Sequence, residues 1–107
     1  MPKHNQSPLV SIICISYNQD QYLAQTLDSF LMQKTNFSFE VIVHDDASVD
    51  NTRKILRGYV NKYPDIIKVI YAKSNRFSKK DYSFISELFK IAKGKYIAMC
   101  EGDDYWT

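Results

Sequence analysis

The sequence predicts an α/β domain in which a mostly parallel sheet lies between two layers of helices. Apolar runs typical of buried strands alternate along the chain with amphipathic segments at helical spacing, in the order β-α-β-α-β-α-β. Strands that alternate with helices of this length pair in parallel, because each helix returns the chain to the start of the next strand. The chain has 107 residues, 45% of them hydrophobic, which suits one domain with a real core.

The composition excludes several classes of partner. The net charge is +2, and apart from Lys79-Lys80 the basic residues are scattered, so nucleic acid is not an expected partner. No apolar run approaches the roughly 18 residues of a membrane helix, and residues 1–8 lack the apolar segment of a signal peptide. Cys14 and Cys100 both lie in predicted buried strands, where they are interpreted as small core side chains in a reducing compartment. We therefore expect a soluble, cytoplasmic protein; action at the inner membrane face stays open.

The first third of the chain reads as a tail, a strand and a helix. Residues 1–8 form the tail, and Leu9–Ile15 is a nearly continuous apolar run, as expected of a strand buried on both faces. Residues 22–33 carry a stripe at helical spacing, made of Leu23, Leu27, Phe30 and Leu31. Asn18 or Asp20 is the expected cap of this helix.

A second strand and helix follow. The strand, Phe39–Val43, is followed by His44 and then by two acids, Asp45 and Asp46. The helix runs to about Tyr63, where Pro64 ends it. Three consecutive residues have the chemistry to cap it, namely Asp50, Asn51 and Thr52.

The last third holds two strands around a polar stretch and a helix. The strand Ile66–Tyr71 precedes a polar segment, residues 72–82, that carries Lys73, Arg76, Lys79 and Lys80. A third helix is marked by Ile85, Leu88, Phe89 and Ala92, and Gly94 is its expected C-terminal cap. The final buried strand is predicted at Tyr96–Met99.

Three carboxylates follow this last strand within four positions, Glu101, Asp103 and Asp104. The carboxyl ends of parallel strands share one edge of the sheet, so these acids are expected beside Asp45-Asp46, Tyr17-Asn18 and Arg76. Clustered carboxylates repel one another, and oxygen ligands of this kind suit Mg²⁺ or Mn²⁺ shared with substrate phosphates. Alone, the stretch fits a solvated acidic turn equally well, because Gly and Asp are ordinary turn residues. The second acidic pair favours a ligand site.

Several nucleotide-binding classes are excluded by missing motifs. The sequence has no G-x-G-x-x-G and no G-x-x-x-x-G-K-[ST], so a glycine-rich cradle for phosphates is absent. Phosphates would then be held by a metal and basic side chains. A phospho-acceptor signalling domain would need its acid pair after the first strand, where this chain has Tyr17-Asn18.

Four segments together resemble family 2 glycosyltransferases of the GT-A fold, a Rossmann-like architecture. They occur in order and at the right spacing within residues 9–107, and they are Ser11–Asn18, Val41–Thr52, Ala92–Ile97 and Cys100–Trp106. The resemblance implies a nucleotide-sugar donor, usually a UDP-sugar, together with Mg²⁺ or Mn²⁺. It also implies transfer to a hydroxyl of a glycan or lipid-linked acceptor, with inversion, in surface polysaccharide biosynthesis.

The resemblance also implies roles for single residues. Asp46 would hydrogen-bond the nucleobase and Tyr17 would pack on it, whereas from the sequence alone Tyr17 is also consistent with a core tyrosine. Glu101-x-Asp103 matches the D-x-D metal motif, although Glu replaces the first Asp. Asp103 would bind the metal, with Asp104 as second ligand or orienting residue. The remaining candidate nucleotide-binding residues are Ile15, Asn18, Arg76, Glu101 and Gly102. Arg76 would offset diphosphate charge, although a solvated basic loop also explains it.

No residue of this chain matches the general base of the family, which lies downstream of the metal motif. Residues 9–107 therefore correspond to the donor-binding half, and we expect this chain alone to be inactive. The alternatives are a non-catalytic nucleotide-binding or assembly module of the same fold, and a nucleotidyltransferase, for which the glycine-rich loop after the first strand is missing. An open sheet edge also predicts a homodimer.

Overall fold

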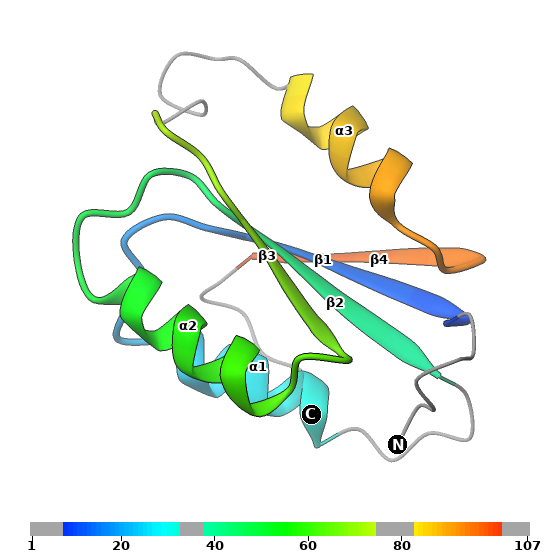
Figure 1. Cartoon of the computed structure of the whole chain (residues 1–107), viewed down its shortest axis with the longest axis horizontal. Coiled ribbons are helices and arrows are strands. Elements are labelled where there is room, and N and C mark those ends of the chain that lie inside the picture. The colour runs from blue at the N-terminus through cyan, green and yellow to red at the C-terminus, as the bar shows by residue number, and fades with distance from the viewer. Residues whose placement is uncertain (1–7, 33–37, 75–82, 102–107) are drawn as a thin grey trace.

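The structure is a computed structural model that describes residues 8–32, 38–74 and 83–101. Within these ranges four strands form one parallel sheet in the order β3-β2-β1-β4, with three helices between them along the chain (Figure 1). The elements are β1 (Val10–Ser16), α1 (Leu23–Leu31), β2 (Phe39–Asp45), α2 (Thr52–Lys62), β3 (Ile67–Tyr71), α3 (Ser83–Ile91) and β4 (Tyr96–Glu101). The predicted element order and the parallel α/β sheet are confirmed.

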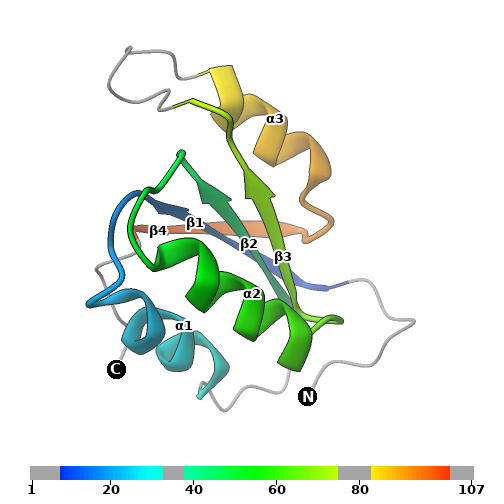
Figure 2. The same ribbon diagram turned by 60° about the vertical axis from the view of Figure 1, so that its left-hand side comes forward.

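The helices lie in two layers, with α1 and α2 together on one face of the sheet and α3 on the other (Figures 1 and 2). Alternate strand residues therefore enter different cores. One core joins Ile12, Cys14 and Val41 of the strands to Phe30 of α1 and Leu56 of α2. The three-layer prediction is confirmed. None of the helices in the described ranges is long and apolar enough to cross a bilayer.

The smaller core lies beneath α3. It contains Ile13 of β1 and Ile42 of β2, which are packed against Phe84 and Leu88 of α3. All four side chains are at most 1% exposed. This core holds α3 against β1 and β2, the two central strands of the described sheet.

The fourth strand differs from its prediction. β4 was expected to be buried, but it is an edge strand whose Tyr96, Ile97 and Met99 side chains are 57%, 42% and 50% exposed. Cys100 is half-buried while Cys14, its register partner on β1, is buried, and both are thiols. An apolar run shows that a strand is suited to burial, but only neighbouring elements can bury it.

The predicted cap of α1 is wrong. Tyr22 occupies its N-cap without a side-chain hydrogen bond. At α2, Asn51 occupies the N-cap without a side-chain bond, and Asp50 Oδ1 instead accepts the Thr52 N–H at 2.9 Å. Asp50 is therefore the acid that serves the start of α2.

Gly94 is also not the C-terminal cap that was predicted. α3 ends at Ile91, and Gly94 has no positive φ. Its N–H donates to Ser11 Oγ at 2.8 Å, and a Cβ on Gly94 would lie 2.5 Å from the Ser11 backbone nitrogen. The glycine is required by close packing of the α3–β4 connection on β1, not by backbone conformation.

Candidate functional site

The carboxyl ends of the strands meet at one edge of the sheet, as the sequence predicts. Ser16 of β1 is in register with Asp45 of β2, which is in register with Tyr71 of β3. Glu101, the last residue of β4, pairs with Ile15 of β1. Four predicted residues of this edge lie outside the described residues, and they are Arg76, Gly102, Asp103 and Asp104.

Asp45 is fully buried, and neighbouring hydrogen-bond donors and Arg53 compensate the charge of its carboxylate. Its Oδ1 accepts hydrogen bonds from the hydroxyls of Ser16, at 3.2 Å, and Ser48. Its Oδ2 accepts from the Ser48 N–H at 3.1 Å and from Arg53 Nε at 2.7 Å. This carboxylate holds the loop after β2 and needs no added cation, so one of the clustered charges that suggested a metal is neutralised within the protein.

Arg53 is the residue of this edge that the sequence analysis missed. Besides its bond to Asp45, it donates from a terminal guanidinium nitrogen to the Ala72 carbonyl, and its guanidinium carbon lies 5.2 Å from the centroid of the Tyr71 ring. It thereby joins the ends of β2 and β3. The sequence held one signal of this role, namely the position of Arg53 in the first turn of α2. A cation there is unfavourable to the helix dipole, so a nearby acid is expected to compensate it.

Asn18 and Asp20 lock the loop after β1 to the loop after β2. Asn18 has φ 49° and its Oδ1 accepts the Val49 N–H at 2.8 Å, while its own N–H donates to Ser48 Oγ at 2.9 Å. Asp20 Oδ2 accepts the Asn51 N–H at 3.3 Å. One or the other was expected to cap α1, but both make tertiary hydrogen bonds instead, and these bonds join the two loops into one platform.

Tyr17 lies in this platform and is 42% exposed. Ile15, two residues earlier, packs against the small core beneath α3. An exposed ring at the strand-end edge is available to stack on a flat ligand, as a buried core tyrosine would not be.

Asp46 is fully buried at the same edge. Its N–H donates to the Ser16 carbonyl at 2.9 Å, and its Oδ1 lies 3.2 Å from Nε2 of His44. His44 is 3% exposed and stacks on Phe84 of α3. A ligand reaches the Asp46 carboxylate only if surrounding side chains move, because no part of the residue contacts solvent.

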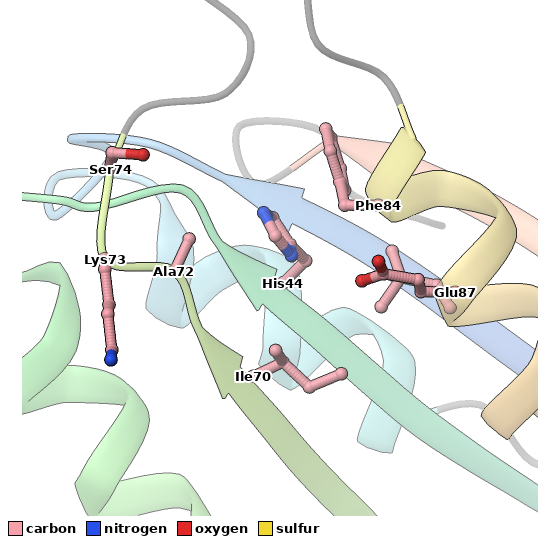
Figure 3. A pocket seen from close by; sticks show the side chains of 8 residues that line it. His44, Ile70, Ala72, Lys73, Ser74, Phe84 and Glu87 are labelled. Atoms are coloured by element: carbon pink, nitrogen blue, oxygen red, sulfur yellow. The ribbon is translucent and has the colours of Figure 1, made fainter.

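A cavity of about 250 Å³ opens between α3 and the ends of β2 and β3 (Figure 3). Figure 3 shows Phe84 and Glu87 reaching toward it from α3 and His44 from β2, while the Lys73 side chain extends away from His44. The residues that line the cavity are His44, Ile70, Ala72, Lys73, Ser74, Phe84, Glu87 and Leu88. The cavity adjoins the edge that carries Asp46.

Two groups near the edge have shifted pKa values. Burial raises the pKa of Asp50, but hydrogen bonds from Thr52 and from the Asp20 N–H lower it more, so it lies below the usual range. Burial also raises the pKa of Tyr71, where Arg57 opposes the shift and Asp45 adds to it. Asp50 is therefore ionised at neutral pH and Tyr71 is not.

Within the part of the chain that the structure describes, no group of three His, Cys, Asp or Glu residues is arranged to hold a metal ion. Asp103 and Asp104, the predicted ligands, follow β4 directly in the sequence and lie outside the described residues. Their carboxylates have the chemistry that Mg²⁺ and Mn²⁺ prefer, so the metal stays a prediction.

The chain is similar to glycosyltransferases in sequence. It is 40% identical over 99 residues to an Escherichia coli protein, WfaP, named as the β-1,3-glucosyltransferase that uses UDP-Glc and α-D-GlcNAc-diphosphoundecaprenol. The match covers 92% of this chain and 37% of the E. coli protein. The chain spans between 28% and 38% of the length of the curated relatives it matches.

The fold is similar to that of two solved glycosyltransferase structures. TarS of S. aureus, crystallised with UDP, superposes with a TM-score of 0.71 at 31% identity, over 90% of this chain and 28% of that one. A Pyrobaculum calidifontis mannosyltransferase in complex with GDP-Man and Mn²⁺ gives 0.76 at 23% identity, over 99% and 30% of the two chains. At that identity the second likeness shows the GT-A fold alone. The model of the glycosyl transferase family 2 matches residues 11–107, and this chain therefore belongs to that family.

Proposed function

We propose that this chain is the donor-binding part of a glycosyltransferase that moves a sugar from a UDP-sugar to an acceptor hydroxyl in surface polysaccharide biosynthesis. The observation that carries the proposal is the edge at which Tyr17 follows β1 and Asp46 follows β2, where the Asp46 N–H donates to the Ser16 carbonyl and Asn18 joins the two loops. The UDP bound to TarS and the UDP-Glc named for the E. coli relative support the choice of nucleotide.

Four residues at the ends of β1 and β2 have distinct tasks in the binding of the nucleotide. The exposed Tyr17 ring stacks on the base, an interaction that contributes about 1–3 kcal/mol in nucleic-acid sites. Asp46 is buried, so the surrounding side chains move to open it to the ligand, and its ionised carboxylate then accepts a hydrogen bond from an N–H of the base. Asn18 and Asp45 fix the loops that present these two residues.

The transfer itself is proposed to proceed with inversion at the anomeric carbon, by attack of an acceptor hydroxyl deprotonated by a general base. None of residues 1–107 is assigned as that base. A Mg²⁺ or Mn²⁺ ion held by Asp103 and Asp104 would stabilise the charge of the departing diphosphate. The chain's own contribution is to bind and orient the nucleotide.

We further propose that the enzyme works in the cytoplasm at the inner membrane face. The E. coli relative is named for an acceptor carried on diphosphoundecaprenol, which is a lipid. An acceptor of the same class would bring the present protein to a membrane surface.

The test of the donor site is calorimetric titration of UDP in the presence of Mn²⁺. Tyr17→Ala is expected to weaken binding about 5- to 150-fold, the equivalent of one base-stacking contact. Tyr22→Ala is the matched control, because Tyr22 is also exposed, at 51%, but lies at the start of α1. Equal loss in both variants, or none in either, would contradict the placement of the base.

The metal is tested separately in the same titration. Asp103→Asn is expected to make UDP binding independent of Mn²⁺, because a diphosphate is held through the ion. Unchanged Mn²⁺ dependence in this variant would remove Asp103 from the metal site. Absence of UDP binding by the full-length protein would favour the assembly module over the enzyme.

A further inference from the structure

His44 is a buried histidine that none of the roles above uses. It is the penultimate residue of β2, it is 3% exposed, and its ring lies on the face of the sheet that α3 covers. Nε2 is 3.2 Å from Oδ1 of Asp46, two residues further along the chain. The histidine therefore contacts the very carboxylate that is proposed to receive the base.

The ring of His44 is held from its other side by α3. It stacks on Phe84 with a centroid separation of 4.1 Å and an angle of 17° between the ring planes. Phe84 is the second residue of α3, is 1% exposed, and packs with Leu88, Ile13 and Ile42. Figure 3 shows the two rings facing each other across the space between β2 and α3. Stacking of this kind fixes the plane of the imidazole and therefore the direction of its nitrogens.

The chemistry of the pair assigns the proton. An ionised carboxylate only accepts hydrogen bonds, so Nε2 carries a hydrogen whenever Asp46 is charged. The bond is then charge-assisted, and it fixes which way the Asp46 carboxylate turns. Because Asp46 is fully buried, water cannot replace this donor without a change in packing.

We propose that His44 is a positioning residue for the nucleotide site, which orients Asp46 and makes nucleotide affinity depend on the seating of α3. This inference rests on the function proposed above. The chain of contacts runs from Phe84 on α3 through His44 to Asp46 at the strand-end edge. If His44 had only a packing role, its stack on Phe84 would matter, but the hydrogen bond from its N–H to Asp46 would not.

The experiment separates the ring from its N–H by titrating UDP with Mn²⁺ into variants of the full-length protein. His44→Phe keeps an aromatic ring against Phe84 and removes the donor, and it is expected to weaken UDP binding about tenfold, the effect of one charge-assisted bond. His44→Gln keeps a donor near the position of Nε2 and is expected to stay within about threefold of wild type. Equal loss in both variants would show a packing role and overturn the proposal.

A second pair of variants guards against misfolding of His44→Phe. His44→Asn is polar and similar to Gln, but its amide is too short to place a donor at the position of Nε2. The proposal expects Asn to bind UDP as weakly as Phe and more weakly than Gln. Asn and Gln variants of equal affinity would contradict it.

A double-mutant cycle with Asp46→Asn shows whether His44 acts through Asp46. If it does, adding His44→Phe to Asp46→Asn causes no further loss of UDP affinity, whereas additive losses would overturn the inference. If wild type binds no UDP, or if Asp46→Asn binds it normally, the proposed function is wrong and so is the inference that rests on it. If Asp46→Asn binds weakly and His44→Phe binds normally, only the inference fails.

Discussion

At the scale of single residues, two adjacent aspartates at the end of β2 have different surroundings. Asp45 turns toward Ser16, Ser48 and Arg53 and holds the loop, while Asp46 turns toward His44 beneath α3. Asp45 is the last residue of β2 and Asp46 is the first residue beyond it, and their side chains leave the chain toward different partners. The sequence shows the pair of acids, but only the strand's orientation between two helix layers assigns each its partner.

Glu40, at the other end of β2, is a third buried acid, and it gives a test by pH. Burial raises its pKa, but donors from Ser11, the Lys93 N–H and Lys68 lower it more, so the folded-state pKa lies below the usual value. A lowered pKa adds stability above the unfolded-state value that is lost as the pH falls through the folded-state value. Glu40→Gln is therefore expected to lower the free energy of unfolding at neutral pH and to approach wild type in acid.

The measurement for Glu40 is urea unfolding of both proteins between about pH 3 and pH 7. The difference in unfolding free energy should shrink steadily below about pH 4.3, the usual value for Glu. A difference that is constant across this range would show that the charge of Glu40 does not contribute.

At the scale of elements, the connection between α3 and β4 is clamped to the start of β1. Ser11 Oγ accepts the Gly94 N–H and donates to Glu40 Oε2 at 2.6 Å, and Glu40 Oε2 also accepts the Lys93 N–H at 2.7 Å. This clamp lies at the opposite end of the sheet from Asp46. It fixes the end of α3, whose beginning carries Phe84.

Replacing the two described glycines tests this close approach. Gly94→Ala is expected to lower the free energy of unfolding by about 1–3 kcal/mol, because the new methyl group would overlap Ser11. Gly58→Ala is the control, since Gly58 lies within α2 and a methyl group added there would have no atom within 4 Å. There the change is expected to stabilise by up to about 1 kcal/mol through helix propensity. Thermal or urea unfolding measures the stability of both variants. A Gly94→Ala variant as stable as wild type would show that the α3–β4 connection does not pack closely on Ser11.

At the scale of the whole molecule, the sheet is open along β4. This strand pairs only with β1 in the described sheet, and it exposes Tyr96, Ile97 and Met99. Unpaired backbone groups beside exposed apolar side chains favour pairing with another strand. This edge is where the predicted homodimer would form, and it is also where further strands of a longer protein would add.

We expect the 107-residue chain to associate with itself in a concentration-dependent way, as measured by sedimentation or light scattering. Ile97→Lys combined with Met99→Lys is expected to shift it toward monomer, because charged side chains on an edge strand oppose pairing. Ile91→Lys is the control, an equally exposed apolar position that lies on α3. A wild-type chain that stays monomeric at high concentration would contradict this expectation.

The sequence by itself determined the order of the elements, the parallel sheet and the edge at which the strand-end residues meet. Those conclusions follow from periodicity and from strand direction, which are local properties. Only the tertiary structure decided how the polar residues of that edge pair. Asn18 and Asp20 bond to the loop after β2 and do not cap α1, and Arg53 of α2 bonds to Asp45. At the opposite end of the sheet, the tertiary structure also decided that Gly94 packs closely on Ser11. It also decided that β4 is exposed. Each of these outcomes depends on which distant segment lies within a few ångströms, and no pattern along the chain carries that distance.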